Sequence, residues 1–169
     1  NGGTTWARIR EFGGKAITTI LIDPEVPDRI IVLTGGKNNN SLETGDAFLS
    51  TNGGTTFASI GGLPLAEWMD GSIGAKDAAG FETDGTARVA ISTNRGDTWS
   101  FVTPPNVSNR NPASGPDLAY SSLSVAASPV DPGRCYVLSG LDQAVYRTRE
   151  RGVVGSWVNV TNNLPPGPQ

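Results

Sequence analysis

Short runs of apolar and β-branched residues recur along the chain, with Gly, Pro, Asn or Asp between them. The first set of four runs occupies residues 16–24, 28–36, 46–52 and 55–64. A second set, in the same order, occupies residues 122–132, 134–140, 144–151 and 156–165. Runs of this length and residue type, bounded by turn residues, predict β-strands. Each set therefore predicts four antiparallel strands.

The middle of the chain shows a less regular pattern. Residues 71–80, 81–93 and 98–104 must supply its strands. Four strands per roughly 40 to 50 residues is typical of a propeller blade. Units of this size stack on one another because none of them buries its own apolar face.

An eight-residue motif is repeated most clearly. Residues 50–57 read STNGGTTF and residues 92–99 read STNRGDTW. Each copy lies between the third and fourth predicted strands, which predicts a hairpin turn. The Asn side chain would bond backbone amides, and the glycine two positions later would take positive φ. The following aromatic residue would fold under the turn.

Two imperfect copies lie near the ends of the chain. The first is NGGTTW at residues 1–6, and the last is RTRERGVVGSW at residues 147–157. The last has Glu150 in place of Asn and two extra residues before Trp157, so we expect a distorted turn. The predicted turn residues are Asn1, Gly3, Trp6, Ser50, Asn52, Gly54, Phe57, Ser92, Asn94, Gly96, Trp99, Gly152 and Trp157.

The pattern S-x-D/N-x-G-x-T-W/F resembles the Asp-box, or BNR repeat. This repeat occurs in sialidases, xyloglucanase-type glycoside hydrolases, sortilin-type receptors and photosystem assembly propellers. Residues 17–36 and 123–140 also resemble the strand, D-P-x-x-P-x-R, strand segment that opens each blade in the xyloglucanase and sortilin-like group. The resemblance implies an all-β propeller of four-stranded antiparallel blades.

About three blades are expected, and three do not close a ring, which takes about four to eight. The expected limits are 1–15 for the outer strand of a preceding blade, then 16–62, 63–105 and 106–165 for the blades. The N-terminal strand lacks its first three partners, so we expect a segment of a longer polypeptide with further blades on either side. The alternative is pairing of the blade edges with another copy.

Composition narrows the possible functions. The 13 basic and 16 acidic side chains give a net charge of -3, and no basic stretch with interleaved aromatics predicts nucleic-acid binding. No apolar run approaches the roughly 18 residues of a membrane span.

The absence of histidine excludes Ser-His and Cys-His nucleophile pairs and histidine metal sites within this sequence. Cys135 lies in an apolar run and is expected to be a buried hydrophobe. No cofactor or metal is expected.

Ligands of propellers are held by the loops at one face, so the long connections are candidate sites. Trp68 would stack on a sugar ring. It has Glu67 beside it, and Arg110 and Tyr120 in the next long connection are further binding candidates. The alternative is that Trp68 seals the gap between two blades.

Carboxylates are the candidate catalytic groups. Asp70 or Asp117 would supply half of the acid pair that a glycosidase needs. The alternative is that both acids are merely solvated. Asp23 and Asp131 each precede a proline, and their recurrence in blade register predicts a turn role instead.

The leading interpretation is a non-catalytic, secreted or cell-surface propeller that binds glycan or protein partners through its loops. The alternative is a segment of a glycoside hydrolase similar to the xyloglucanase type. A second alternative is an assembly protein joined through blade edges. Sialidase activity is not expected, since no Arg-Ile-Pro motif introduces a first arginine of the substrate site.

Overall fold

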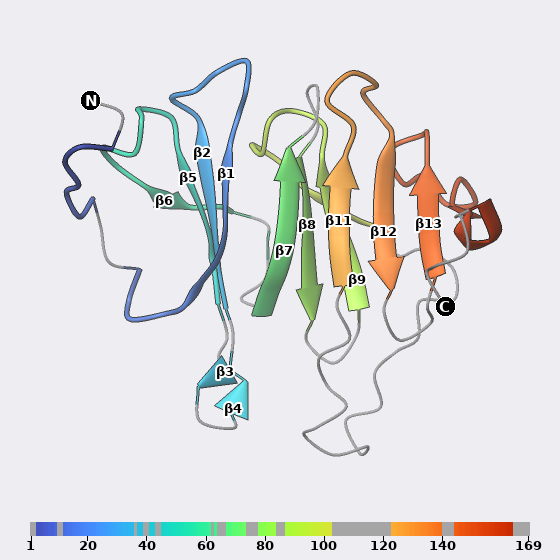
Figure 1. Ribbon diagram of the computed structural model, residues 1–169, viewed down its shortest axis with the longest axis horizontal. Coiled ribbons are helices and arrows are strands. Elements are labelled where there is room, and N and C mark those ends of the chain that lie inside the picture. Colours follow the sequence, from blue (N-terminus) through green and yellow to red (C-terminus); the bar gives the residue numbers. More distant parts are fainter. Residues whose placement is uncertain are drawn as a thin grey trace.

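The structure is a computed structural model that describes residues 3–9, 12–35, 37–38, 41–42, 45–61, 63, 67–73, 78–83, 87–102, 123–139 and 144–163. These residues form three four-stranded antiparallel sheets and a two-stranded hairpin (Figure 1). They include one short 3-10 helix, η3 (Thr161–Asn163), and no α-helix. No helix in this described part of the chain is long and apolar enough to cross a membrane.

Each sheet is a meander in which strands that follow one another in sequence are paired. Sheet 1 contains β1 (Ile17–Ile22), β2 (Ile30–Thr34), β5 (Ala47–Ser50) and β6 (Ala58–Ser59). Sheet 2 contains β7 (Glu67–Ile73), β8 (Ala78–Thr83), β9 (Ala87–Ser92) and β10 (Ser100–Val102). Sheet 3 contains β11 (Leu123–Ala127), β12 (Cys135–Ser139), β13 (Ala144–Thr148) and β14 (Val158–Asn159). The prediction of an all-β fold of four-stranded antiparallel units is confirmed.

The connection between β2 and β5 carries a small hairpin of its own, formed by β3 (Lys37–Asn38) and β4 (Ser41–Leu42). This hairpin extends beyond the end of sheet 1 (Figure 1). Where the polypeptide of one blade ends and that of the next begins stays a prediction.

The strands of sheet 2 depart most from the sequence pattern. Its first strand begins at Glu67, inside a segment that was expected to be a loop, and the expected run 71–80 spans the end of β7 and the start of β8. Residues 67–73 contain no run of β-branched residues, so local preference gave little signal. Pairing with β8 along the whole strand determines the conformation instead.

The first strands of the three sheets lie side by side, with β7 between β1 and β11 (Figure 1). The sheets then extend away from this line through their second, third and fourth strands. This is a radial arrangement, in which neighbouring sheets pack face to face as propeller blades do.

Two apolar clusters hold the sheets together. Sheets 1 and 2 share the first, which contains Leu21, Ile31, Leu33, Ala47, Ile60, Leu63 and Ala90. Sheets 2 and 3 share the second, which contains Val89, Ile91, Val125, Cys135, Val137, Ala144, Tyr146 and Trp157. Consecutive residues of β9 thus belong to different clusters, because side chains alternate between the two faces of a strand. β9 is therefore buried on both faces. Cys135 is a buried hydrophobe as predicted.

The repeated eight-residue motif forms the turn between the third and fourth strands, as predicted. In sheet 1 the Ser50 hydroxyl accepts a hydrogen bond from the Gly54 amide at 2.9 Å and donates one to Asn52 Oδ1 at 3.0 Å. Asn52 Oδ1 also accepts from the Thr56 amide at 2.9 Å. Two short side chains thus satisfy amides that the tight turn would otherwise leave without partners.

Sheet 2 repeats this network closely. The Ser92 hydroxyl accepts from the Gly96 amide at 2.7 Å, and Asn94 Oδ1 accepts from the Thr98 amide at 2.9 Å. Gly96 has a φ of 90° and its counterpart Gly54 one of 84°, so the predicted left-handed glycines are present. The indole of Trp99 donates to the Gly96 carbonyl at 3.0 Å, which places the ring under the turn as expected.

The turn of sheet 3 keeps the same core despite its insertion. Thr148 replaces the serine, and its hydroxyl accepts from the Gly152 amide at 3.1 Å. The Ser156 hydroxyl, 2.7 Å from Thr148 Oγ1, stands where the other turns have the Asn oxygen. Trp157, which follows the insertion, is buried at 7% exposure.

The strand expected at the N-terminus is not formed. Residues 3–9 and 12–16 are turns and irregular backbone. A strand needs a neighbouring strand to pair with, and none of the strands in the described part of the chain is paired with residues 3–9. Phe12 nevertheless packs against Phe48 and Phe57, with ring centroids 5.0 and 5.3 Å apart, so the segment is anchored to sheet 1.

Candidate functional site

The two ends of the sheets differ in their connections. In a four-stranded meander, the connections from strand two to strand three and from one sheet to the next leave from the same end, here named the loop end. The tight turns from strand one to two and from three to four lie at the opposite end, the turn end. The β3–β4 hairpin and the first residues of β7 belong to the loop end.

Three predicted site residues lie in β7, the strand between the first strands of the other two sheets. Glu67 pairs with Thr83 and Trp68 with Glu82, and a bulge separates Trp68 from Asp70. The prediction that they lie in a loop is wrong. Glu67 and Trp68 still lie at the loop end, whereas Asp70 sits further along the strand, so the three residues do not start from one loop.

The other predicted site residues, Arg110, Asp117 and Tyr120, lie outside the described residues. β10, which precedes them in the sequence, ends at the loop end, and β11, which follows them, begins there. Pairing of Asp70 with Asp117 across a cleft stays a prediction.

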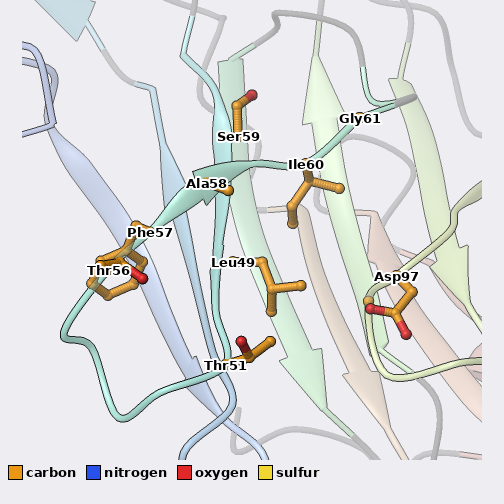
Figure 2. Close-up of a pocket in the computed structure, with 10 residues that line it drawn as sticks. Leu49, Thr51, Thr56, Phe57, Ala58, Ser59, Ile60, Gly61 and Asp97 are labelled. Atoms are coloured by element: carbon orange, nitrogen blue, oxygen red, sulfur yellow. The ribbon is translucent and has the colours of Figure 1, made fainter.

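A groove of about 310 Å³ lies between the outer part of sheet 1 and the turn of sheet 2 (Figure 2). It is lined by Leu49, Thr51, Thr56, Phe57, Ala58, Ser59, Ile60, Gly61, Gly96 and Asp97. The lining combines apolar side chains with three hydroxyl groups. Asp97 is the one carboxylate among these lining residues, so the groove is suited to binding and lacks the acid pair of a glycosidase.

A cluster of charged side chains at the turn end links sheets 1 and 2. Arg95, in the turn of sheet 2, forms ion pairs with Asp23 at 2.6 Å and with Glu25, both in the β1–β2 connection. Arg29 of sheet 1 donates to the Arg95 carbonyl and forms an ion pair with Asp97. These contacts join residues about 70 positions apart, so the cluster locks the two sheets together.

Asp23 is the buried member of this cluster. Burial alone would raise the pKa of its carboxyl group, but hydrogen bonds from Arg95 and from the amides of Glu25 and Val26 outweigh burial and lower the pKa below its usual value. The same ion pairs raise the pKa of Arg95. Asp23 is therefore ionised at neutral pH and held as an acceptor.

The turn role predicted for Asp23 is confirmed, because its Oδ1 accepts from the Glu25 amide at 2.9 Å and the Val26 amide at 3.1 Å. The matching of Asp23 with Asp131 is wrong. Ser128 holds the equivalent place, since its hydroxyl accepts from the Asp131 amide at 3.1 Å. Asp131 instead pairs with Arg134 at 2.6 Å. The Asp-Pro pairs were wrongly matched, because each connection has two prolines, and Pro24 is the first of its pair whereas Pro132 is the second.

Sequence reasoning missed Arg95 and Asp97, which hold the variable positions of the second motif. Their charges were the available signal, since the first motif has Gly53 and Thr55 at these positions. Arg95 also has a φ of 60°, unusual for a residue other than glycine. The packing of one sheet on the next, which the motif alone does not encode, gives these charges their partners.

In the part of the chain that the structure describes, no three His, Cys, Asp or Glu side chains lie close enough together to hold a metal ion. Asp46 is engaged in the fold. Its carboxylate accepts from the Ala47 amide at 2.8 Å and from the Ser59 hydroxyl at 2.7 Å. These bonds tie the start of β5 to β6.

The chain resembles known proteins in its three-dimensional structure. No protein-family model and no curated protein matches the chain. YCF48 from Cyanidioschyzon merolae matches with a TM-score of 0.60 and 14% identity, over 86% of this chain and 37% of that one. YCF48 bound to D1 peptide matches with a TM-score of 0.57 and 14% identity, over 86% of this chain and 40% of that one.

The GH74 xyloglucanase from Xanthomonas campestris also matches, with a TM-score of 0.55 and 13% identity over 81% of this chain and 21% of that one. These are β-propeller proteins, and at such identities the likeness shows the fold alone. The chain is thus a propeller-type stack of blades. It spans less than half the length of each of these proteins.

Proposed function

We propose that the chain is a section of a non-catalytic, extracellular or cell-surface β-propeller that binds a glycan or protein partner at its loop end. The observation that carries this proposal is the side-by-side placement of β1, β7 and β11. Converging first strands bring the loop-end connections of three sheets to one region, which is where propellers hold ligands.

The turn end is suited to a structural role. Asp23, Glu25 and Asp97 are all held in ion pairs that join two sheets. Because these charges stabilise the packing of the two sheets, we propose that the loop end is the one that recognises a partner. YCF48, one of the structural neighbours, binds a D1 peptide, and this favours a protein partner. The extracellular location rests on the resemblance of the turn motif to sortilin-type receptors.

A second candidate is a glycoside hydrolase segment, favoured by the likeness to GH74 xyloglucanases. Here Asp70 and Asp117 would be the acid pair, which requires carboxyl groups about 5 to 10 Å apart. Assembly through blade edges is a third candidate.

The test uses two probes, soluble xyloglucan and an array of 15-residue synthetic peptides. We expect retention of one probe without release of reducing sugar, and weaker retention by at least about tenfold in Trp68→Ala, since an anchoring aromatic contributes about 1.4 kcal/mol or more. Trp6→Ala is the matched control, because Trp6 lies in the N-terminal turn-like segment, away from the loop end, and should not change binding.

Two results contradict the proposal. One is equal binding by wild type and Trp68→Ala. The other is release of reducing sugar that disappears in Asp70→Asn, which establishes the hydrolase instead.

A further inference from the structure

Along its first strand, β1, one face of sheet 1 is apolar and exposed. Val32 of β2, which pairs with Ile20, is already buried at 3% exposure. Along β1, Leu21 points into the cluster shared with sheet 2, while its neighbours Ile20 and Ile22 lie on the opposite face. Their side chains are 58% and 57% exposed. Two exposed isoleucines on the same face of one strand mark a surface that another element covers.

Comparison of equivalent positions in sheets 1 and 3 indicates that this face of sheet 1 is one that packs against a neighbouring sheet. Asp23 and Ser128 begin equivalent connections, so Ile20 corresponds to Val125 of sheet 3. Val125 is 5% exposed because it packs against sheet 2. The face of sheet 1 that carries Ile20 is thus the counterpart of a face that is buried elsewhere in the same molecule.

The N-terminal segment has the conformation of a turn between a third and a fourth strand. Gly3 has a φ of 81°, close to the 90° of Gly96. A methyl group placed on Gly3 would lie 3.3 Å from the ring of Trp6, and one on Gly96 would lie 3.6 Å from the ring of Trp99. Residues 3–6 therefore form the second half of the repeated turn.

The residues that follow occupy the place of a fourth strand. Ile9 comes three positions after Trp6, as Val102 comes three positions after Trp99. A methyl group on Gly54 would lie 3.5 Å from Ile9 Cδ1, and one on Gly152 would lie 2.7 Å from Val102 Cγ2. Ile9 thus sits against sheet 1 as the fourth strand of sheet 2 sits against sheet 3.

We infer that the exposed face of sheet 1 receives a three-stranded antiparallel sheet from the same polypeptide, and that residues 6–9 close its open edge as the fourth strand. The repeated turn links a third strand directly to a fourth, so the strand that pairs with residues 6–9 reaches them through the turn at residues 3–6. A complete four-stranded sheet does not fit, because its own fourth strand would collide with residues 6–9.

This assignment excludes a second copy that docks its sheet 3, which already carries β14. It also accounts for Trp6 and Ile9, which are 90% and 66% exposed and would lie against the added sheet. The inference is independent of which ligand the loop end binds, so failure of one leaves the other standing.

Thiol labelling tests the inference, because Cys135 is the single cysteine and is buried. Ile20→Cys is compared in the 169-residue chain and in the polypeptide expressed at its natural length. Val154→Cys is the matched control, since Val154 is 99% exposed in a turn at the far sheet. We expect Ile20→Cys to react at least roughly tenfold more slowly at natural length, while Val154→Cys reacts equally in both.

Hydrogen exchange of the unmodified protein provides a second measurement that needs no substitution. The amides of residues 6–9 should exchange more slowly at natural length than in the 169-residue chain, because a fourth strand is hydrogen-bonded to a third. Equal labelling of Ile20→Cys in the two proteins, or rapid exchange of residues 6–9 at natural length, overturns the inference. Protection that appears only on dimerisation of the 169-residue chain also overturns it, since a second copy would then cover the face.

Discussion

At the scale of single residues, one serine hydroxyl organises each turn. Ser92 Oγ accepts from the buried Gly96 amide and from the Asn94 amide, and donates to Asn94 Oδ1. The bonds lie within five consecutive residues, so the turn is specified locally. This explains why an eight-residue motif was enough to predict the turn.

Removal of this hydroxyl should destabilise the protein. In Ser92→Ala the buried Gly96 amide loses its acceptor, and we expect a loss of about 1 to 3 kcal/mol in the free energy of unfolding. Urea denaturation measures the change. Ser100→Ala, at an exposed position of β10, is the control and should stay within about 0.5 kcal/mol of wild type. Equal stability of the two variants would show that the hydroxyl is dispensable.

The lowered pKa of Asp23 predicts a pH dependence of stability. Between the folded pKa and the unfolded pKa of about 3.9, the unfolded chain binds more protons, so stability falls as pH decreases through this window. Thermal unfolding from pH 7 down to pH 2 should show this loss in wild type. Asp23→Asn should be less stable at pH 7 and should show a smaller decline, and parallel curves for the two proteins would argue against the assignment.

At the scale of elements, the turn of one sheet packs on the strands of the next. A methyl group on Gly96 would lie 2.7 Å from Ile31 Cδ1, in β2 of sheet 1. The joint between sheets therefore depends on a glycine for space as well as for its backbone conformation.

Gly96→Ala tests this close approach. We expect a destabilisation of about 2 to 4 kcal/mol, because the left-handed conformation and the overlap with Ile31 both oppose the methyl group. Gly61→Ala is the control, since nothing lies within 4 Å of its added carbon and its φ is not positive. Chemical denaturation compares the two, and a Gly96→Ala protein as stable as Gly61→Ala would refute tight packing at this joint.

The sequence predicted some elements better than others for physical reasons. Sheets 1 and 3 contain runs such as residues 30–34 and 135–139, whose side chains favour strands by themselves. Sheet 2 begins with residues 67–73, which lack such a run and become a strand through pairing. Local preference therefore located two sheets, and tertiary pairing was needed for the third.

The candidate site was less predictable than the turns. The ion pairs of Arg95 join residues about 70 positions apart, and no local sequence pattern predicts such pairs. The groove beside Asp97 likewise exists only where two sheets meet.

At the scale of the whole molecule, three radial sheets leave Ile20 and Ile22 of β1 exposed on one face of sheet 1. The N-terminal segment packs against the same sheet. The exposed side chains are informative because neighbouring sheets pack face to face twice within the described chain, once between sheets 1 and 2 and once between sheets 2 and 3. The proposed joint thus requires at least one more sheet beside sheet 1, and ligand recognition at the loop end is our proposal.

A crystal structure of the polypeptide at its natural length tests this account most directly. We predict a closed ring in which β1, β7 and β11 line the axis, residues 6–9 form the fourth strand of a blade, and Ile20 and Ile22 are buried beneath its first three strands. An open stack in which Ile20 and Ile22 face solvent, or a face covered by a second copy of the chain, would contradict it.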